Sequence, residues 1–89
     1  MNQLEDMQTF VRIVDAGSMT KAAEQLGTVK SAVSKRLAIL EKRLGVTLLT
    51  RTTRTHTLTE TGRSYYQQCV QIIDQVTEVE SGLRQQNSE

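Results

Sequence analysis

The sequence predicts a mainly α-helical fold: a core of three helices, a short β-hairpin and a long final helix. Apolar residues recur every three or four positions through most of the chain, which is the period of an α-helix. Residues 46–58 are instead rich in threonine, valine and leucine, and threonine and valine favour strands. A last apolar stripe runs over residues 65–83, further than a core built from so short a chain can cover.

The first expected helix spans residues 3–16, with apolar residues inward and polar residues, Asp6 included, outward. Gly17 is expected to end it. Ser18 or Thr20 can then cap the next helix by accepting a hydrogen bond from a backbone N–H group. A phosphate contact by the same hydroxyl is compatible with capping, because helix N-termini favour anions.

Residues 20–44 form the centre of the predicted fold: a short helix, a turn at Gly27, and a second helix that begins at Thr28 or Val29 and is closed by Gly45. One face of the second helix is apolar and carries Val33, Leu37, Leu40 and Leu44. Its other side and first turn are small, hydroxylated and basic, with Lys30, Ser31, Ser34, Lys35, Ala38 and Lys42. This pattern is typical of a helix-turn-helix, whose hydroxyls and lysines donate hydrogen bonds to phosphates and base edges.

Residues 46–58 predict two short strands, Thr47–Leu49 and His56–Leu58. The loop between them carries both Arg51 and Arg54. A β-hairpin that follows a recognition helix is a wing, so these two arginines are placed to reach phosphates or the minor groove.

Thr59 is the expected N-cap of the final helix, which is predicted over Glu60–Arg84 and would be roughly 37 Å long. Its apolar seam is spaced like the a and d positions of a coiled coil and consists of Tyr65, Cys69, Ile72, Val76, Val79 and Leu83. The first two can pack on their own domain. The remaining four are expected to pair with the same helix of a second chain, giving a homodimer. Residues 85–89 are polar and are expected to fray.

Charge is unevenly distributed, although the net charge is only +1. Residues 30–54 hold seven basic residues against the single acid Glu41, whereas the segments on both sides are net acidic. A confined basic patch indicates a polyanionic partner such as DNA. The alternative on charge alone is a solvated helix face.

Composition argues against several other classes of protein. No apolar run approaches the ~18 residues of a transmembrane helix, and the acidic, polar N-terminus does not look like a signal peptide. A single cysteine, Cys69, indicates a reducing compartment, here the cytoplasm. The single histidine, His56, is expected on a strand surface, and the two residues cannot build a metal site within one chain. We therefore expect no cofactor and no enzyme; the remaining alternative is a helical protein-interaction module without DNA binding.

These motifs together resemble the N-terminal DNA-binding region of LysR-type transcriptional regulators, over essentially all 89 residues. The resemblance is carried by the helix Leu4 to Val14 and by three blocks: GSMTKAAEQL at 17–26, SAVSKRLAILEKRLG at 31–45 and LLTRTTRTHTLTETG at 48–62. Two departures stand out. Val29 occupies a position where many members have serine or threonine, and Ser31 replaces a common proline and adds a hydroxyl to the outer face.

The resemblance implies a winged helix-turn-helix over residues 1–58 and a linker helix over residues 59–89 that pairs two chains. It also implies an effector-binding domain of two α/β lobes beyond these residues, through which alone a small-molecule effector would act. It places Lys30, Ser31, Ser34 and Lys35 in the major groove, Ser18 and Thr20 at a phosphate, and Arg51 and Arg54 in the wing. The expected function is sequence-specific binding of double-stranded DNA, as a homodimer on an inverted repeat.

Overall fold

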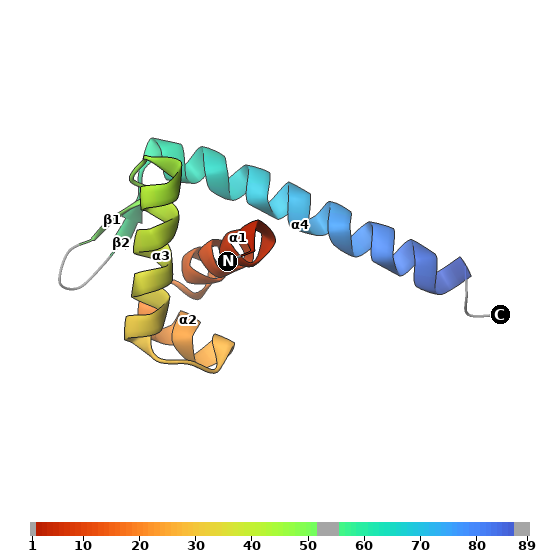
Figure 1. Ribbon diagram of the computed structural model, residues 1–89, viewed down its shortest axis with the longest axis horizontal. Helices are drawn as coiled ribbons and strands as arrows, with labels where there is room; N and C mark the ends of the chain where they lie inside the picture. The colour runs from red at the N-terminus through yellow and green to blue at the C-terminus, as the bar shows by residue number, and fades with distance from the viewer. Residues whose placement is uncertain (1, 52–55, 87–89) are drawn as a thin grey trace.

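The computed structural model describes residues 2–51 and 56–86, and this part of the chain holds four α-helices and one antiparallel hairpin. In chain order the elements are α1 (Gln3–Ala16), α2 (Met19–Leu26), α3 (Lys30–Leu44), β1 (Leu49–Arg51), β2 (His56–Leu58) and α4 (Glu60–Gln86). Helices α1 to α3 gather at one end, and α4 projects from them as a rod, so the molecule measures 53 × 26 × 22 Å (Figure 1). The mainly helical fold is confirmed. None of the described helices combines the length and the apolar character that a membrane span requires.

The first two helices end at glycines, as the sequence predicts. Gly17 and Gly27 have φ angles of 84° and 70°, in the left-handed region that glycine adopts without strain. Of the two candidate caps for α2, Ser18 takes the role: its Oγ accepts a hydrogen bond from the Lys21 backbone N–H at 3.1 Å. Thr20 lies inside the first turn of α2 and is exposed.

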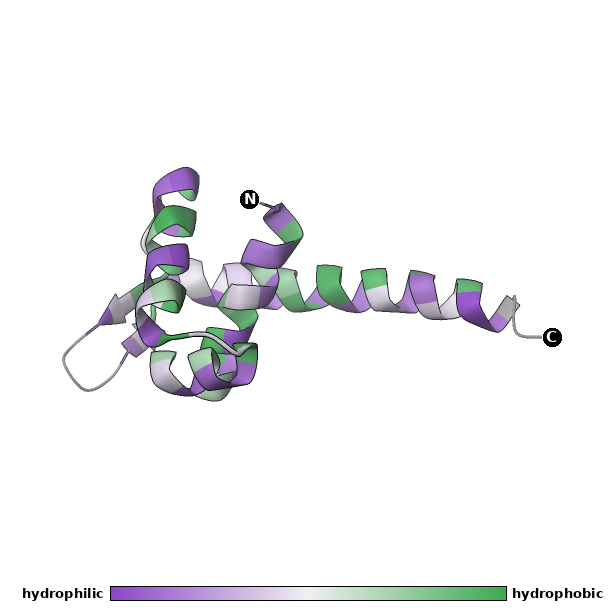
Figure 2. Cartoon of the chain, turned by 60° about the horizontal axis from the view of Figure 1, so that its bottom comes forward, coloured by the Kyte–Doolittle hydropathy of each residue, from purple (hydrophilic) through white to green (hydrophobic). Residues whose placement is uncertain are grey.

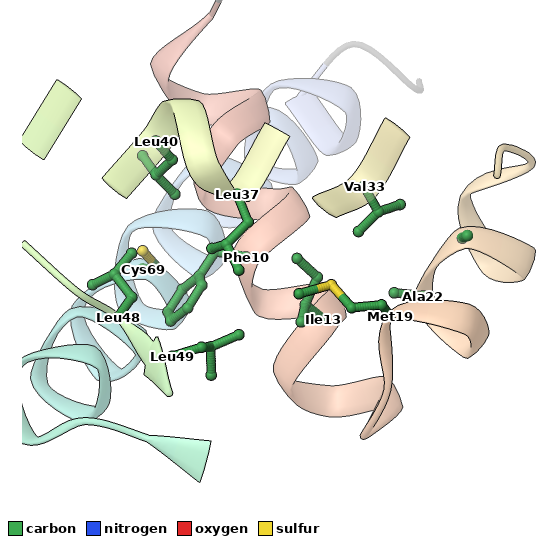
Figure 3. Close-up of a cluster of buried hydrophobic side chains, with 11 residues drawn as sticks. Phe10, Ile13, Met19, Ala22, Val33, Leu37, Leu40, Leu48, Leu49 and Cys69 are labelled. Carbon is green, nitrogen blue, oxygen red and sulfur yellow. The ribbon is translucent and has the colours of Figure 1, made fainter. Parts of the chain in front are cut away.

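The core lies where α1, α2 and α3 meet, and the start of β1 and of α4 closes it. Its buried apolar side chains are Phe10, Ile13, Met19, Ala22, Ala23, Val33, Leu37, Leu40, Leu48, Leu49 and Cys69. Phe10 lies in the middle of this cluster, between the side chains from α3 and those from β1 and α4 (Figure 3). The apolar face predicted for α3 is confirmed at Val33, Leu37 and Leu40, which are buried.

Two side chains depart from the predicted faces. Leu44 is 36% exposed, because it stands in the last turn of α3, at the margin of the core. Asp6, expected outward, is only 5% exposed. The reason is that α1 packs against α3, where Arg43 Nη2 donates to Asp6 Oδ2 at 3.2 Å and neutralises the buried carboxylate.

The hairpin pairs Leu49 with Leu58 and Arg51 with His56. Its first strand starts two residues later than predicted and therefore includes Arg51, which the sequence placed in the loop. His56 is half-buried rather than on the strand surface. Its Nε2 atom is buried and has no hydrogen-bond partner within the described part of the chain.

Helix α4 is capped by Thr59, as predicted: Thr59 Oγ1 accepts from the Gly62 N–H at 2.9 Å. The same hydroxyl donates to the Thr47 carbonyl at 2.7 Å, which ties α4 to the segment before β1. The helix continues two residues beyond the predicted end at Arg84, to Gln86, and residues 87–89 lie outside the described range. Hydrophobic bands recur along one side of α4 over its whole length (Figure 2).

Candidate DNA interface

The N-terminal half of α3 presents polar side chains to solvent because its opposite face is buried. Val33 and Leu37 are 0% and 1% exposed and fix the rotation of the helix on the core. Lys30, Ser31 and Lys35 are consequently exposed, as the sequence predicts. A helix that projects small hydroxylated and cationic side chains from a rigid core fits the major groove of DNA in size and in chemistry.

The start of α3 is left open. Val29 is the N-cap, with φ −109° and ψ 157°, and no side chain accepts a hydrogen bond there. Its carbonyl accepts from the N–H groups of Ala32 and Val33, at 3.1 and 3.3 Å. The first turn contains no acidic residue and carries Lys30. The free N–H groups and the positive end of the helix dipole therefore remain available for a phosphate.

Arg51 connects the hairpin to α3. Its Nη1 atom donates a hydrogen bond to the Ser34 Oγ at 2.7 Å, across 17 positions of the chain. Ser34 is half-buried and Arg51 is exposed. The structure thus brings together two of the predicted site residues from separate elements. Arg54, the other predicted wing residue, lies outside the described residues.

Ser18 and Thr20 stand at the start of α2, which packs directly against α3. Ser18 is half-buried and its oxygen already accepts from the Lys21 N–H, so its hydroxyl proton remains for an outward contact. Thr20 is exposed in the first helical turn. Both residues therefore stand at the positive end of the α2 dipole.

Two acidic residues close to this surface are turned inward, which the sequence pattern did not predict. Glu41 Oε2 accepts from the backbone N–H groups of Leu48 and Leu49, at 2.7 and 3.2 Å, and so holds the start of β1 against α3. Asp6 is paired with Arg43. The outer side of α3 therefore keeps its cationic character. The sequence contained one signal for the inward-facing role of Glu41, which is the only acidic residue among residues 30–54.

The described titratable groups with shifted pKa values, Tyr65, Tyr66 and Cys69, lie on α4 and not at this surface. Burial, with a further contribution from Cys69, raises the pKa of Tyr65 to about 12. Burial also raises the pKa of the Cys69 thiol. Both groups are therefore neutral near pH 7, and the thiolate that cysteine nucleophiles require is disfavoured.

Comparison with known proteins gives one family for this chain. The family model described as "Bacterial regulatory helix-turn-helix protein, lysR family" matches residues 4–63. An HTH-type transcriptional repressor of Pseudomonas aeruginosa is 50% identical over 84 residues, which cover 94% of this chain and 26% of that protein. The HTH-type transcriptional regulator CrgA of Neisseria meningitidis is 43% identical over 79 residues, which cover 89% of this chain and 26% of CrgA. The chain thus spans about a quarter of the length of these curated relatives.

Solved structures share the same arrangement of helices and hairpin. A complex of the BenM DNA-binding domain with benA site 1 DNA superposes with a TM-score of 0.89 at 30% identity, covering 94% of each chain. The structure of CrgA from Neisseria meningitidis gives a TM-score of 0.76 at 41% identity, covering 93% of this chain and 28% of that one. The first of these similar structures contains DNA.

Proposed function

We propose a function from the premise that this chain belongs to the LysR family of bacterial helix-turn-helix regulators. In this proposal its winged helix-turn-helix (residues 1–58) binds double-stranded DNA sequence-specifically. In this proposal α3 enters the major groove and the hairpin lies on the backbone or in the minor groove. The observation that carries it is the exposed, hydroxylated and basic N-terminal half of α3, held outward by a buried apolar face. The DNA present in the complex of the similar BenM domain supports the same function.

The individual contacts follow from chemistry and position. Lys30, Ser31, Ser34 and Lys35 are proposed to reach base edges in the major groove, because they lie in the first two turns of α3. Ser18 and Thr20 are assigned to a phosphate, which positions the protein without reading sequence. Arg51 and Arg54 are assigned to phosphates or the minor groove.

Fluorescence anisotropy with a DNA site obtained by in vitro selection tests this proposal. Ser34→Ala and Lys35→Ala should each weaken binding to the selected site by about 1–3 kcal/mol and relax the base preference at one position. Arg84→Ala, which removes a cation near the far end of α4, is the matched control and should leave binding unchanged. Wild-type affinity should fall steeply with salt. A chain that binds no DNA at low salt would refute the proposal.

The linker helix, α4 within residues 59–89, is proposed to pair two chains into a homodimer. Ile72, Val79 and Leu83 are 38%, 65% and 55% exposed, and Val76 is half-buried on the same stripe. Three of these apolar residues, Ile72, Val76 and Val79, line a shallow groove of about 320 Å³ on α4, together with Gln75 and Glu80. Exposed apolar surface of this extent is typical of interaction sites. Pairing on a two-fold axis would set two α3 helices on one inverted repeat.

Sedimentation velocity over a range of protein concentrations tests the pairing. The wild type should shift from monomer to dimer as concentration rises. The double variant Val76→Glu with Val79→Glu should stay monomeric, since like charges would face each other across the axis. A wild type that remains monomeric throughout, and that binds one half-site as tightly as the inverted repeat, would refute the dimer.

The alternative function is a helical protein-interaction module without DNA binding, which the apolar side of α4 alone would favour. The anisotropy experiment separates the two, because a module of that kind has no salt-dependent affinity for DNA. We assign the chain no enzymatic activity, in line with curated relatives that are named as transcriptional regulators. We further propose that a small-molecule effector regulates this protein and that the protein is cytoplasmic.

A further inference from the structure

The hairpin is attached to α3 at two levels. Near the end of α3, Glu41 Oε2 accepts from the N–H groups at the start of β1. Two helical turns earlier, the Ser34 Oγ accepts from Arg51 Nη1 at 2.7 Å. Ser34 and Glu41 are seven residues apart and therefore lie on nearly the same side of the helix, about 10 Å apart along its axis. Strand β1 thus runs back along α3 and delivers the Arg51 guanidinium to Ser34.

This contact restricts what Ser34 can do. A serine hydroxyl has one hydrogen to donate and two lone pairs that accept, whereas a guanidinium only donates. The Arg51 donor occupies one lone pair of Ser34, which leaves the hydroxyl hydrogen and the second lone pair for other partners. The nearby positive charge also disfavours the approach of a second donor, such as an amino group of a base.

We infer that Arg51 is a positioning residue that sets Ser34 as a hydrogen-bond donor, so that Ser34 selects a base edge carrying an acceptor. In the major groove these acceptors are N7 of the purines, O6 of guanine and O4 of thymine. The excluded edges are the amino groups of cytosine and adenine. A serine without such a neighbour reads either kind of edge. The inference rests on the proposed function, and it adds the chemical class of base atom that one residue reads.

Base analogues in the selected site test the inference by deleting single atoms. 7-Deazapurines remove N7, 2-aminopurine removes O6 of guanine, and a 2-pyrimidinone nucleoside removes either O4 of thymine or the amino group of cytosine. Purine riboside in its deoxy form removes the amino group of adenine. For each position, we compare the affinity for the natural site with the affinity for the analogue and call their quotient the atom penalty.

In the wild type, we expect one acceptor deletion to carry a penalty of about 3- to 10-fold that is lost in Ser34→Ala. Ser34→Thr retains a hydroxyl and should retain this penalty. Arg51→Met should lose it although Ser34 is still present, and combining Arg51→Met with Ser34→Ala should cause no further loss. Lys42→Met, which removes an exposed cation elsewhere on α3, should lower overall affinity while leaving the atom penalty intact.

The inference is overturned if the Ser34-dependent penalty belongs to an amino group, if no base analogue shows one, or if Arg51→Met leaves it at the wild-type value. These results are distinct from failure of the proposed function, in which the wild-type chain would not bind the natural site at all. Residual salt-dependent DNA binding by Arg51→Met shows that the variant is folded.

Discussion

The two halves of α4 share one apolar period but lie in different surroundings. In the packed region, which we define as the α1–α3 cluster, the hairpin and α4 up to Cys69, the thiol of Cys69 is fully buried and the Tyr65 ring lies 5.4 Å from that of Phe10. In the projecting segment, residues 72–85, Val79 and Leu83 are more than half exposed. Helical spacing therefore identifies the face of a helix that is apolar, but it does not identify what covers that face.

The packed region determines the stability of a single chain, and the projecting segment determines its assembly with another. Burial in the packed region stabilises the fold of a single chain, whereas the projecting segment gains stability only when another surface covers it. Substitutions in the two regions should consequently differ in size, in sign and in their dependence on protein concentration.

The largest effect is expected from Leu37→Ala, which opens a cavity in the packed region. Leu37 is 1% exposed, and truncation of such a side chain costs about 2–5 kcal/mol of unfolding free energy. This is a large share of the stability of a small domain. Denaturant titration followed by circular dichroism measures it.

Leu83→Ala is the matched control in the projecting segment, since it removes the same atoms from a side chain that is 55% exposed. Its cost in dilute solution should stay below about 0.5 kcal/mol. Equal losses for both variants would contradict the division into two regions.

Gly62→Ala should have the next largest effect. Gly62 is in the first turns of α4, and a Cβ atom there would lie 2.1 Å from the backbone oxygen of Leu48. A backbone atom can yield only if the segment before β1 moves, so we expect a loss of about 1–3 kcal/mol. A melting temperature equal to that of the wild type would show that Gly62 does not approach the backbone oxygen of Leu48 closely.

The sequence predicted the helices, their glycine ends and the Thr59 cap because these are set by local spacing and by single residues. It missed contacts between segments distant in the chain. Asp6 looked solvent-facing, since periodicity within α1 carries no information about Arg43, which is 37 positions away. The Ser34–Arg51 hydrogen bond likewise depends on where β1 returns along α3. In the candidate site, residue types were predictable, whereas the partner of each side chain was not.

Alkaline pH should lower the stability of the packed region, by less than Gly62→Ala does. Burial raises the pKa of Cys69 above its ordinary value of 9.0 and that of Tyr65 from 10.0 to about 12. The unfolded chain therefore releases these protons first, and stability present below about pH 9 is lost as the pH rises towards 12. Melting temperatures across this range should fall, and Tyr65→Phe, which keeps the ring beside Phe10, should flatten the decline. A decline equally steep in that variant would exclude Tyr65 as a cause.

A small gain in stability is expected from Gly82→Ala in the projecting segment. A Cβ atom at Gly82 meets nothing within 4 Å, in contrast to the crowded Gly62 of the same helix. Alanine restricts the unfolded chain and favours the helix, which is worth about 0.5–1 kcal/mol in an exposed helix interior. We expect a higher melting temperature in dilute solution, where the chain is monomeric. If the same substitution weakens the dimer in sedimentation, then a partner helix approaches α4 closely at Gly82; if it leaves the dimer unchanged, then the contact is confined to the seam from Ile72 to Leu83.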